Sequence, residues 1–97
     1  MPRVFVRKAA KADVADTFAW YEARRNGLGF EFADEVSATY TAIEEQPLRF
    51  PVVLDDIRMA VVHRFPYLIY FVSVPTGSSI IAVLHGHRDP QVWQRRR

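Results

Sequence analysis

The sequence predicts an α+β domain in the order β-α-α-β-β-β, in which a helical hairpin packs on one face of a mainly antiparallel sheet. Three observations predict this class. Two consecutive stretches in the first half repeat apolar residues at helical spacing. The other stretches are rich in the β-branched and aromatic residues that favour strands. The chain has 97 residues and is 49% apolar, so we expect one domain over residues 1–97 with a single core.

The first half predicts a strand followed by two helices. Residues 3–8 read Arg-Val-Phe-Val-Arg-Lys, which is typical of a short strand. A helix is expected over 11–25, ended by Gly27, and a second over 30–46, ended by Pro47. The apolar side chains expected to face the core are Val14, Phe18, Tyr21, Ala33, Val36, Tyr40 and Ile43.

The second half predicts three strands. Residues 47–51 form a connector with a proline at each end, and strands are expected over 55–65, 67–74 and 79–87. A turn at 75–78 joins the last two strands into a hairpin. We expect the strand near the N-terminus to join the same sheet.

Alternation along the strands predicts which side chains share a face. It puts Arg58 and Arg64 on one face of their strand, and Ile81, His85 and His87 on one face of the last strand. Because a buried, unpaired arginine is costly, we expect the face of Arg58 and Arg64 to be uncovered. That face would be a groove lined by arginine, histidine and tyrosine.

Composition excludes several classes of protein. There is no cysteine, so neither a disulfide framework nor a thiolate metal site is expected. The N-terminus lacks the apolar core of a signal peptide, and no apolar run approaches the length of a membrane span, so we expect a cytoplasmic protein without membrane contact. Residues 51–97 carry six arginines against three aspartates, which favours an anionic partner for this half, either nucleic acid or an acidic peptide.

Candidate chemical groups gather in the last strand. His85 and His87 point the same way as Asp89, but too few further ligands lie near them, so no metal and no other cofactor is expected. The chain has neither a glycine-rich phosphate loop nor a nucleophile elbow. Metal-independent cleavage of RNA remains an alternative, because Arg64, His85 and Arg88 are residue types that can act as base, acid and stabilising cation.

Several short motifs follow one another along nearly the whole chain. They are Asp13, Trp20-Tyr21-Glu22, Gly27-Leu-Gly29-x-Glu31-Phe32, the connector 47–51, Ile57-Arg58, Arg64-Phe-Pro-Tyr-x-Ile-Tyr70, Val83-x-His85 and Arg88-Asp-Pro90. Together they resemble the ParE side of the RelE/ParE superfamily of bacterial toxins, the plasmid stabilization family. The resemblance implies the toxin of a type II toxin–antitoxin module, neutralised by a cognate antitoxin. A hetero-oligomer of the two proteins is among the assemblies it allows. As in ParE-type members, it further implies poisoning of DNA gyrase, blocked replication and growth arrest.

The superfamily also contains ribosome-dependent mRNA endonucleases of the RelE type, and this function is the alternative. Those members place an arginine where this chain has Tyr67 and a tyrosine near the position of Trp93. They also use lysines before the sheet, whereas this chain has no lysine after Lys11. Arg88 does match a RelE-type arginine. We therefore favour protein binding over catalysis. A member that only binds its antitoxin, without toxicity, is the third hypothesis.

Two sets of contact residues are expected, because arginine and tryptophan are enriched in interfaces and family members receive a helix and a strand of antitoxin across the hairpin and sheet. The residues expected to bind the target are Arg58, Arg64, Arg88, Trp93, Arg95, Arg96 and Arg97. The residues expected to bind the antitoxin are Trp20, Arg24, Arg25, Leu48, Phe50, Leu54 and Tyr67.

Overall fold

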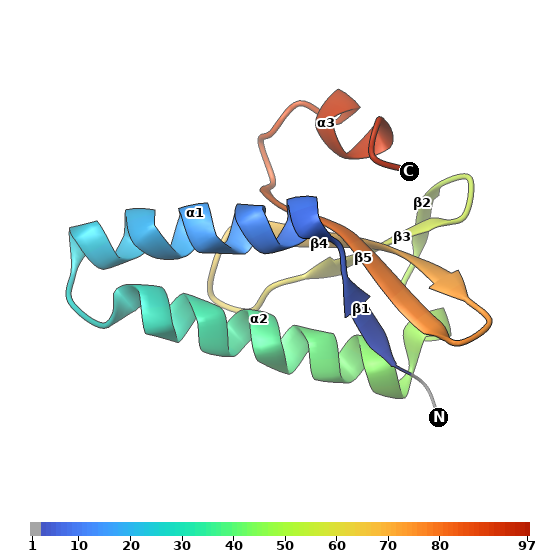
Figure 1. Ribbon diagram of the computed structural model, residues 1–97, viewed down its shortest axis with the longest axis horizontal. Helices are drawn as coiled ribbons and strands as arrows, with labels where there is room; N and C mark the ends of the chain where they lie inside the picture. The colour runs from blue at the N-terminus through green and yellow to red at the C-terminus, as the bar shows by residue number, and fades with distance from the viewer. Residues whose placement is uncertain (1–2) are drawn as a thin grey trace.

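The computed structural model describes residues 3–97 and has two long helices against a five-stranded sheet (Figure 1). The elements are β1 (Val4–Val6), α1 (Lys8–Arg24), α2 (Leu28–Glu45), the 3-10 turn η1 (Pro47–Arg49), β2 (Val52–Leu54), β3 (Ile57–Val61), β4 (Tyr67–Val74), β5 (Gly77–His85) and α3 (Gln91–Gln94). The sheet order is β1-β5-β4-β3-β2, with β1 parallel to β5 and the other pairs antiparallel. The predicted fold class is confirmed.

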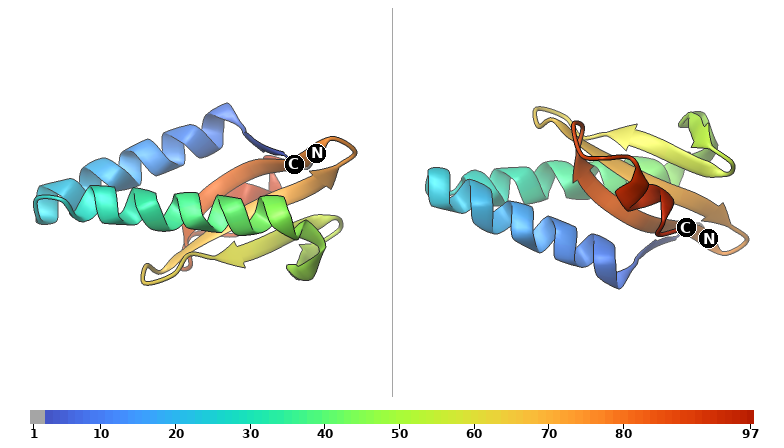
Figure 2. Two further views of the ribbon diagram at one scale, coloured as in Figure 1. Left: turned by 90° about the horizontal axis from the view of Figure 1, so that it is seen from below. Right: turned by 90° about the horizontal axis from the view of Figure 1, so that it is seen from above.

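The helical hairpin covers one face of the sheet. Seen from below, α2 crosses in front of the strands and α1 lies beside it (Figure 2). The core between these layers is formed by buried side chains from both, chiefly Phe32, Val36, Ile43, Ala60, Val62, Phe65, Ile69, Phe71, Ile80 and Val83. Val36 and Ile43 were expected in this core, whereas Phe32 was not.

The opposite face of the sheet is covered by a short helix, α3, that the sequence did not predict. The short helix α3 lies over it when the molecule is seen from above (Figure 2). Trp93 of α3 stacks on Tyr70, with ring centroids 4.3 Å apart and an interplanar angle of 11°. A second core forms beneath, from Ile57, Tyr70, Val72, Ile81, Ala82, Leu84 and Trp93. No helix within residues 3–97 is long and apolar enough to cross a membrane.

The predicted strand 55–65 is wrong in its bounds and in its faces. Asp55 takes a positive φ of 50° in a tight turn between β2 and β3, so the chain pairs with itself here. Ala60 and Val62 share the face of Arg58 and are buried beneath the helices, so this face is not the uncovered one. Arg58 avoids burial because it opens β3 and donates to the backbone, as described below, and Arg64 lies beyond the strand.

The last strand contains an irregularity that alternation could not show. Tyr70 pairs with Ala82 but Phe71 pairs with Ile80, so Ile81 is an extra residue opposite β4. This bulge reverses the faces: Ile80 and Val83 contact the helix-side core, whereas Ile81 lies in the core beneath α3. The prediction that Ile81 shares a face with His85 is therefore wrong.

Candidate functional site

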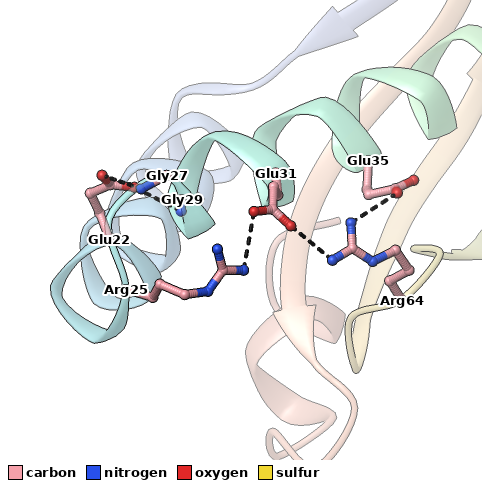
Figure 3. Close-up of polar contacts among 7 residues, drawn as sticks. All are labelled: Glu22, Arg25, Gly27, Gly29, Glu31, Glu35 and Arg64. Carbon is pink, nitrogen blue, oxygen red and sulfur yellow. Dashed lines mark hydrogen bonds and ion pairs between the residues drawn. The ribbon is translucent and has the colours of Figure 1, made fainter.

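The tip of the helical hairpin is fixed by backbone contacts. Gly27 precedes α2 with a φ of 90°, a conformation that favours glycine. The Glu22 carboxylate accepts hydrogen bonds from the backbone N–H groups of Gly27, at 2.8 Å, and Gly29, at 2.9 Å. It thereby satisfies donors that the first turn of α2 would otherwise leave free (Figure 3). A Cβ on Gly29 would lie 2.6 Å from the Phe18 carbonyl oxygen, so the close approach of the helices requires glycine.

An ion-pair network joins this tip to the turn after β3 (Figure 3). Glu31 accepts from Arg25 at 3.1 Å and from Arg64 at 2.9 Å, and Arg64 lies 3.8 Å from Glu35. The hydrogen bond from Arg64, followed by that from Arg25, lowers the pKa of the Glu31 carboxyl. Arg64 takes a positive φ of 71° in this turn. Two of the predicted contact residues, Arg25 and Arg64, are thus tied to α2.

A groove runs between α1 and the end of β5, and we call it the α1–β5 groove. Its larger part is a cavity of about 500 Å³ lined by Asp16, Thr17, Trp20, Tyr21, Pro66, Tyr67 and His85. A smaller part of about 100 Å³ shares Asp16, Thr17, Tyr67 and His85 and adds Asp13, Val83, Leu84 and Arg88. Trp20 is half exposed and the Arg24 guanidinium lies 4.0 Å from its ring centroid. The groove combines aromatic walls with carboxylates.

One ring nitrogen of His85 is already engaged in a local hydrogen bond. Its Nδ1 atom accepts a hydrogen bond from the His87 backbone N–H at 3.0 Å. Its ring meets Tyr67 edge-on, with centroids 5.4 Å apart. An imidazole that accepts at Nδ1 carries its proton on Nε2 when neutral, so the nitrogen that faces away from the backbone is a donor. Within residues 3–97, no three histidine, aspartate or glutamate side chains are placed to hold a metal ion together.

One of the C-terminal arginines, Arg96, is held against α1 and β5. Asp13 of α1 accepts from Arg96 at 2.5 and 3.1 Å and from the Val83 backbone N–H at 3.0 Å. Arg96 also donates to the Ile81 carbonyl at 3.3 Å, and its own carbonyl accepts from Arg7 at 2.9 Å. These contacts satisfy the backbone of β5 at its bulge, where β1 no longer pairs with it. We call the residues from Gln91 to Arg97 the C-terminal strap.

The residues predicted to bind a target are dispersed. Arg58 donates to the carbonyl oxygens of Leu48, at 3.3 Å, and Phe50, at 2.6 Å. Trp93 is buried, and Arg97 pairs with Asp56. Two of the predicted residues, Arg88 and Arg95, lie exposed in the segment around α3.

The residues predicted to bind an antitoxin form two separate surfaces. Trp20 and Tyr67 line the α1–β5 groove, and Arg24 stacks on Trp20. Leu48, Phe50 and Leu54 lie instead at the opposite edge of the sheet, around η1 and β2. That edge exposes more apolar side chains than expected, because Leu48 is 69% exposed and the neighbouring Val52 and Val53 are 49% and 40% exposed.

Sequence reasoning missed Asp16 and Thr17 in the groove. The available signal was their spacing from Trp20, since positions three and four residues apart share one face of a helix. Of the three residues proposed for RNA cleavage, the structure brings together His85 and Arg88, which line the smaller cavity. Arg64 does not line it and faces α2 instead.

Comparison with known proteins places this architecture in a family. The sequence matches the family described as "ParE toxin of type II toxin-antitoxin system, parDE" over residues 4–90. None of the curated proteins matches the chain. The solved structure described as "Chromosomal ParDE TA system from P. aeruginosa" aligns with a TM-score of 0.76 at 13% identity, covering 88% of this chain and 96% of that one. At this identity the likeness shows the fold alone. The match over residues 4–90 shows that the chain belongs to the ParE toxin family of type II toxin–antitoxin systems.

Proposed function

We propose that this chain arrests growth by binding DNA gyrase, stabilising its cleaved complex with DNA, and that a cognate antitoxin neutralises it. The observation that carries the proposal is the family match over residues 4–90. Two surfaces support a role in protein binding. The α1–β5 groove offers an aromatic-walled cavity, and the edge around β2 offers unpaired backbone groups beside exposed apolar side chains.

Several features support binding over catalysis. Arg64 is paired with Glu31, so its charge is already partly neutralised. The lone pair of His85 at Nδ1 is taken by a backbone N–H, which leaves a donor where a general base would need an acceptor. Asp16 lines the same groove as His85, and its carboxylate would repel a phosphodiester.

Arg88 and Arg95 are the proposed contacts to the target, because both are exposed in the segment around α3. Arg58, Arg64, Trp93, Arg96 and Arg97 have partners within the chain, and we assign them the positioning of this surface. Exposed guanidinium groups suit DNA phosphates or acidic side chains of gyrase. Their contacts should weaken as salt is added.

The decisive experiment adds the purified chain to gyrase, supercoiled plasmid and ATP, and measures linear DNA after detergent and protease treatment. We expect cleaved plasmid to accumulate with the wild type, and to fall at least about tenfold with Arg88→Ala because a charged contact is removed. Arg49→Ala is the matched control, since Arg49 is an exposed arginine near the far edge of the sheet. A chain that stops growth yet traps no cleaved plasmid would overturn the gyrase proposal.

One observation favours ribosome-dependent mRNA cleavage as a second candidate: His85 and Arg88 line one cavity. His85→Ala separates the two functions. A nuclease should lose activity with this substitution, whereas a gyrase poison should keep most of its toxicity. Growth arrest by the two proteins, measured with mapping of mRNA ends, distinguishes these outcomes.

A further inference from the structure

We propose that the α1–β5 groove receives a basic side chain, lysine or arginine, from the antitoxin. The inference rests on the proposed function, because it takes an antitoxin as the partner. It deepens that function by stating which chemistry the groove recognises.

The charge of the larger cavity carries the proposal. Asp16 is exposed and, within residues 3–97, its carboxylate meets no hydrogen-bonding or oppositely charged group of the chain at bonding distance. The other carboxylate of the groove, Asp13, is paired with Arg96. His85 also lines the larger cavity, beside Tyr21 and Tyr67, and its Nδ1 atom accepts a hydrogen bond from the His87 backbone N–H. The larger cavity therefore presents one unpaired negative charge.

The walls of the cavity suit the rest of such a side chain. Trp20 and Tyr67 present aromatic surface in the same cavity as Asp16. The methylene stem of a lysine or arginine packs well against aromatic rings while its charged end reaches a carboxylate. Trp20 already accepts one cation from within the chain, because the Arg24 guanidinium lies 4.0 Å from its centroid.

The groove is ill suited to the other classes of ligand that this chain could meet. An acidic peptide or a nucleic-acid phosphate would approach Asp16 against like charge. Arg88 shares the smaller cavity with Asp16, but within residues 3–97 no ion pair joins these two side chains. A wholly apolar anchor would bury the Asp16 carboxylate without a partner, which is costly.

The test measures the affinity of the cognate antitoxin for three proteins: the wild type, Asp16→Asn and Asp34→Asn. Asp34 is the matched control, because it is an exposed aspartate within α2 and its substitution changes the net charge equally. We expect Asp16→Asn to weaken binding roughly tenfold, as for loss of a charged hydrogen bond, and Asp34→Asn to change it less than about twofold.

A second arm identifies the basic residue. Each lysine and arginine of the antitoxin is replaced by alanine, and binding is measured against both the wild type and Asp16→Asn. One antitoxin residue should weaken binding to the wild type but have little further effect on Asp16→Asn. If no lysine or arginine of the antitoxin shows this coupling to Asp16 in binding affinity, the inference is overturned.

Failure of the inference and failure of the proposed function give different results. If the antitoxin binds Asp16→Asn as tightly as the wild type, the groove does not take a basic side chain and the antitoxin proposal stands. If Asp16→Asn instead lowers gyrase trapping without changing antitoxin affinity, the groove belongs to the target. If the antitoxin does not bind the wild type, the inference and the proposed neutralisation are both wrong, whereas gyrase trapping is judged by its own assay.

Discussion

At the scale of single residues, the junction of the two long helices depends on a glycine, Gly29, which has no side chain. Gly29 allows the start of α2 to approach the backbone of Phe18, and the same approach places Glu22 within hydrogen-bonding distance of α2. The aromatic side chains of the two helices then meet, as Phe18 and Phe30 do edge-on with centroids 4.8 Å apart. The close packing at the hairpin tip depends on this contact.

Gly29→Ala should therefore destabilise the fold. The added methyl group would overlap a carbonyl oxygen that belongs to a helix, so relief requires the helices to move. We expect a loss of about 2 kcal/mol in the free energy of unfolding, measured by urea denaturation. Gly86→Ala is the control, because a Cβ there has its nearest neighbour at 3.7 Å, and we expect a change within about 0.5 kcal/mol. Equal effects of the two substitutions would contradict this account.

Tyr40 makes the stability of the fold decrease at alkaline pH. Its hydroxyl is buried without a hydrogen-bond partner among residues 3–97. Burial, followed by the nearby charge of Asp13, raises the pKa of Tyr40 from 10.0 to about 12. The unfolded chain releases this proton at lower pH than the folded chain, so stability is full below pH 10.0 and falls as pH rises towards 12.

Tyr40→Phe should remove that loss. We expect the free energy of unfolding at pH 7 to stay within about 1 kcal/mol of the wild type, because no hydrogen bond is lost. Between pH 10.0 and about 12 the variant should lose less stability than the wild type. Urea unfolding at pH 7 and in this alkaline range tests both statements, and identical alkaline losses would refute the assignment.

At the scale of elements, the C-terminal strap completes the sheet. Trp93 covers Tyr70 on one face, while Arg96 and Asp13 close the edge of β5 beyond the bulge. The side chains of Arg96 and Asp13 are 23% and 11% exposed, so this ion pair is largely shielded from water. A short helix without a core of its own is thus held by contacts to α1, β4 and β5.

Arg96→Ala should weaken this closure. It leaves the Asp13 carboxylate and the Ile81 carbonyl without their partner, and we expect a loss of about 2 kcal/mol in thermal or urea unfolding. Arg95→Ala is the matched control, because Arg95 is exposed and, within residues 3–97, its side chain hydrogen-bonds only to Gln91 of α3. That change should cost less than about 0.5 kcal/mol. Equal stability of Arg96→Ala and Arg95→Ala would contradict this account, because it would mean that the C-terminal strap is frayed in solution.

Local patterns predicted the elements better than their faces. The bounds of β4 were predicted as 67–74 and are found at Tyr67–Val74, because a long apolar run between two turn signals is distinctive. The strand β2 was missed, since three residues after a proline give too short a pattern. The bulge at Ile81 was invisible, because alternation assumes an unbroken ladder.

The candidate site depended on contacts that no pattern contains. The arginines Arg58, Arg64 and Arg96 appeared as surface charges in the sequence, but each has a partner within the fold, and those of Arg64 and Arg96 are remote along the chain. Trp20 and Tyr67 were predicted as contact residues from the family resemblance, and the structure brings them together in one groove. Their binding role stays a prediction.

At the scale of the whole molecule, exposed ion pairs make the fold sensitive to acid. Arg64 and Arg25 lower the pKa of Glu31 below its ordinary 4.5, and Arg97 lowers that of Asp56 below its ordinary 3.8. A lowered folded pKa means that the stabilisation is full above the ordinary value and is lost as pH falls through the lowered one. These pairs join α2 to the turn after β3, and the strap to the turn before it.

Stability should therefore be flat near neutral pH and fall once pH drops below 4.5. Glu31→Gln should be slightly less stable than the wild type at pH 7 and should lose less on acidification. Asp34→Asn, at an exposed position outside the network, should follow the wild type. Thermal unfolding at low ionic strength from pH 7 to pH 3 measures this, and added salt should shrink the difference. A pH profile unchanged by Glu31→Gln would count against the network.

The parallel pairing of β1 with β5 bears on how the chain reaches its native state. Three of the four strand pairings join neighbours along the chain, whereas β1 and β5 bring its two ends together (Figure 1). Closing so long a loop costs entropy that only later contacts recover, so we expect the β2–β5 meander to form early and β1 to add last. Until β1 arrives, β5 presents a free edge to other unfinished chains. The exposure of this protein to association during folding is then set by how quickly its ends meet.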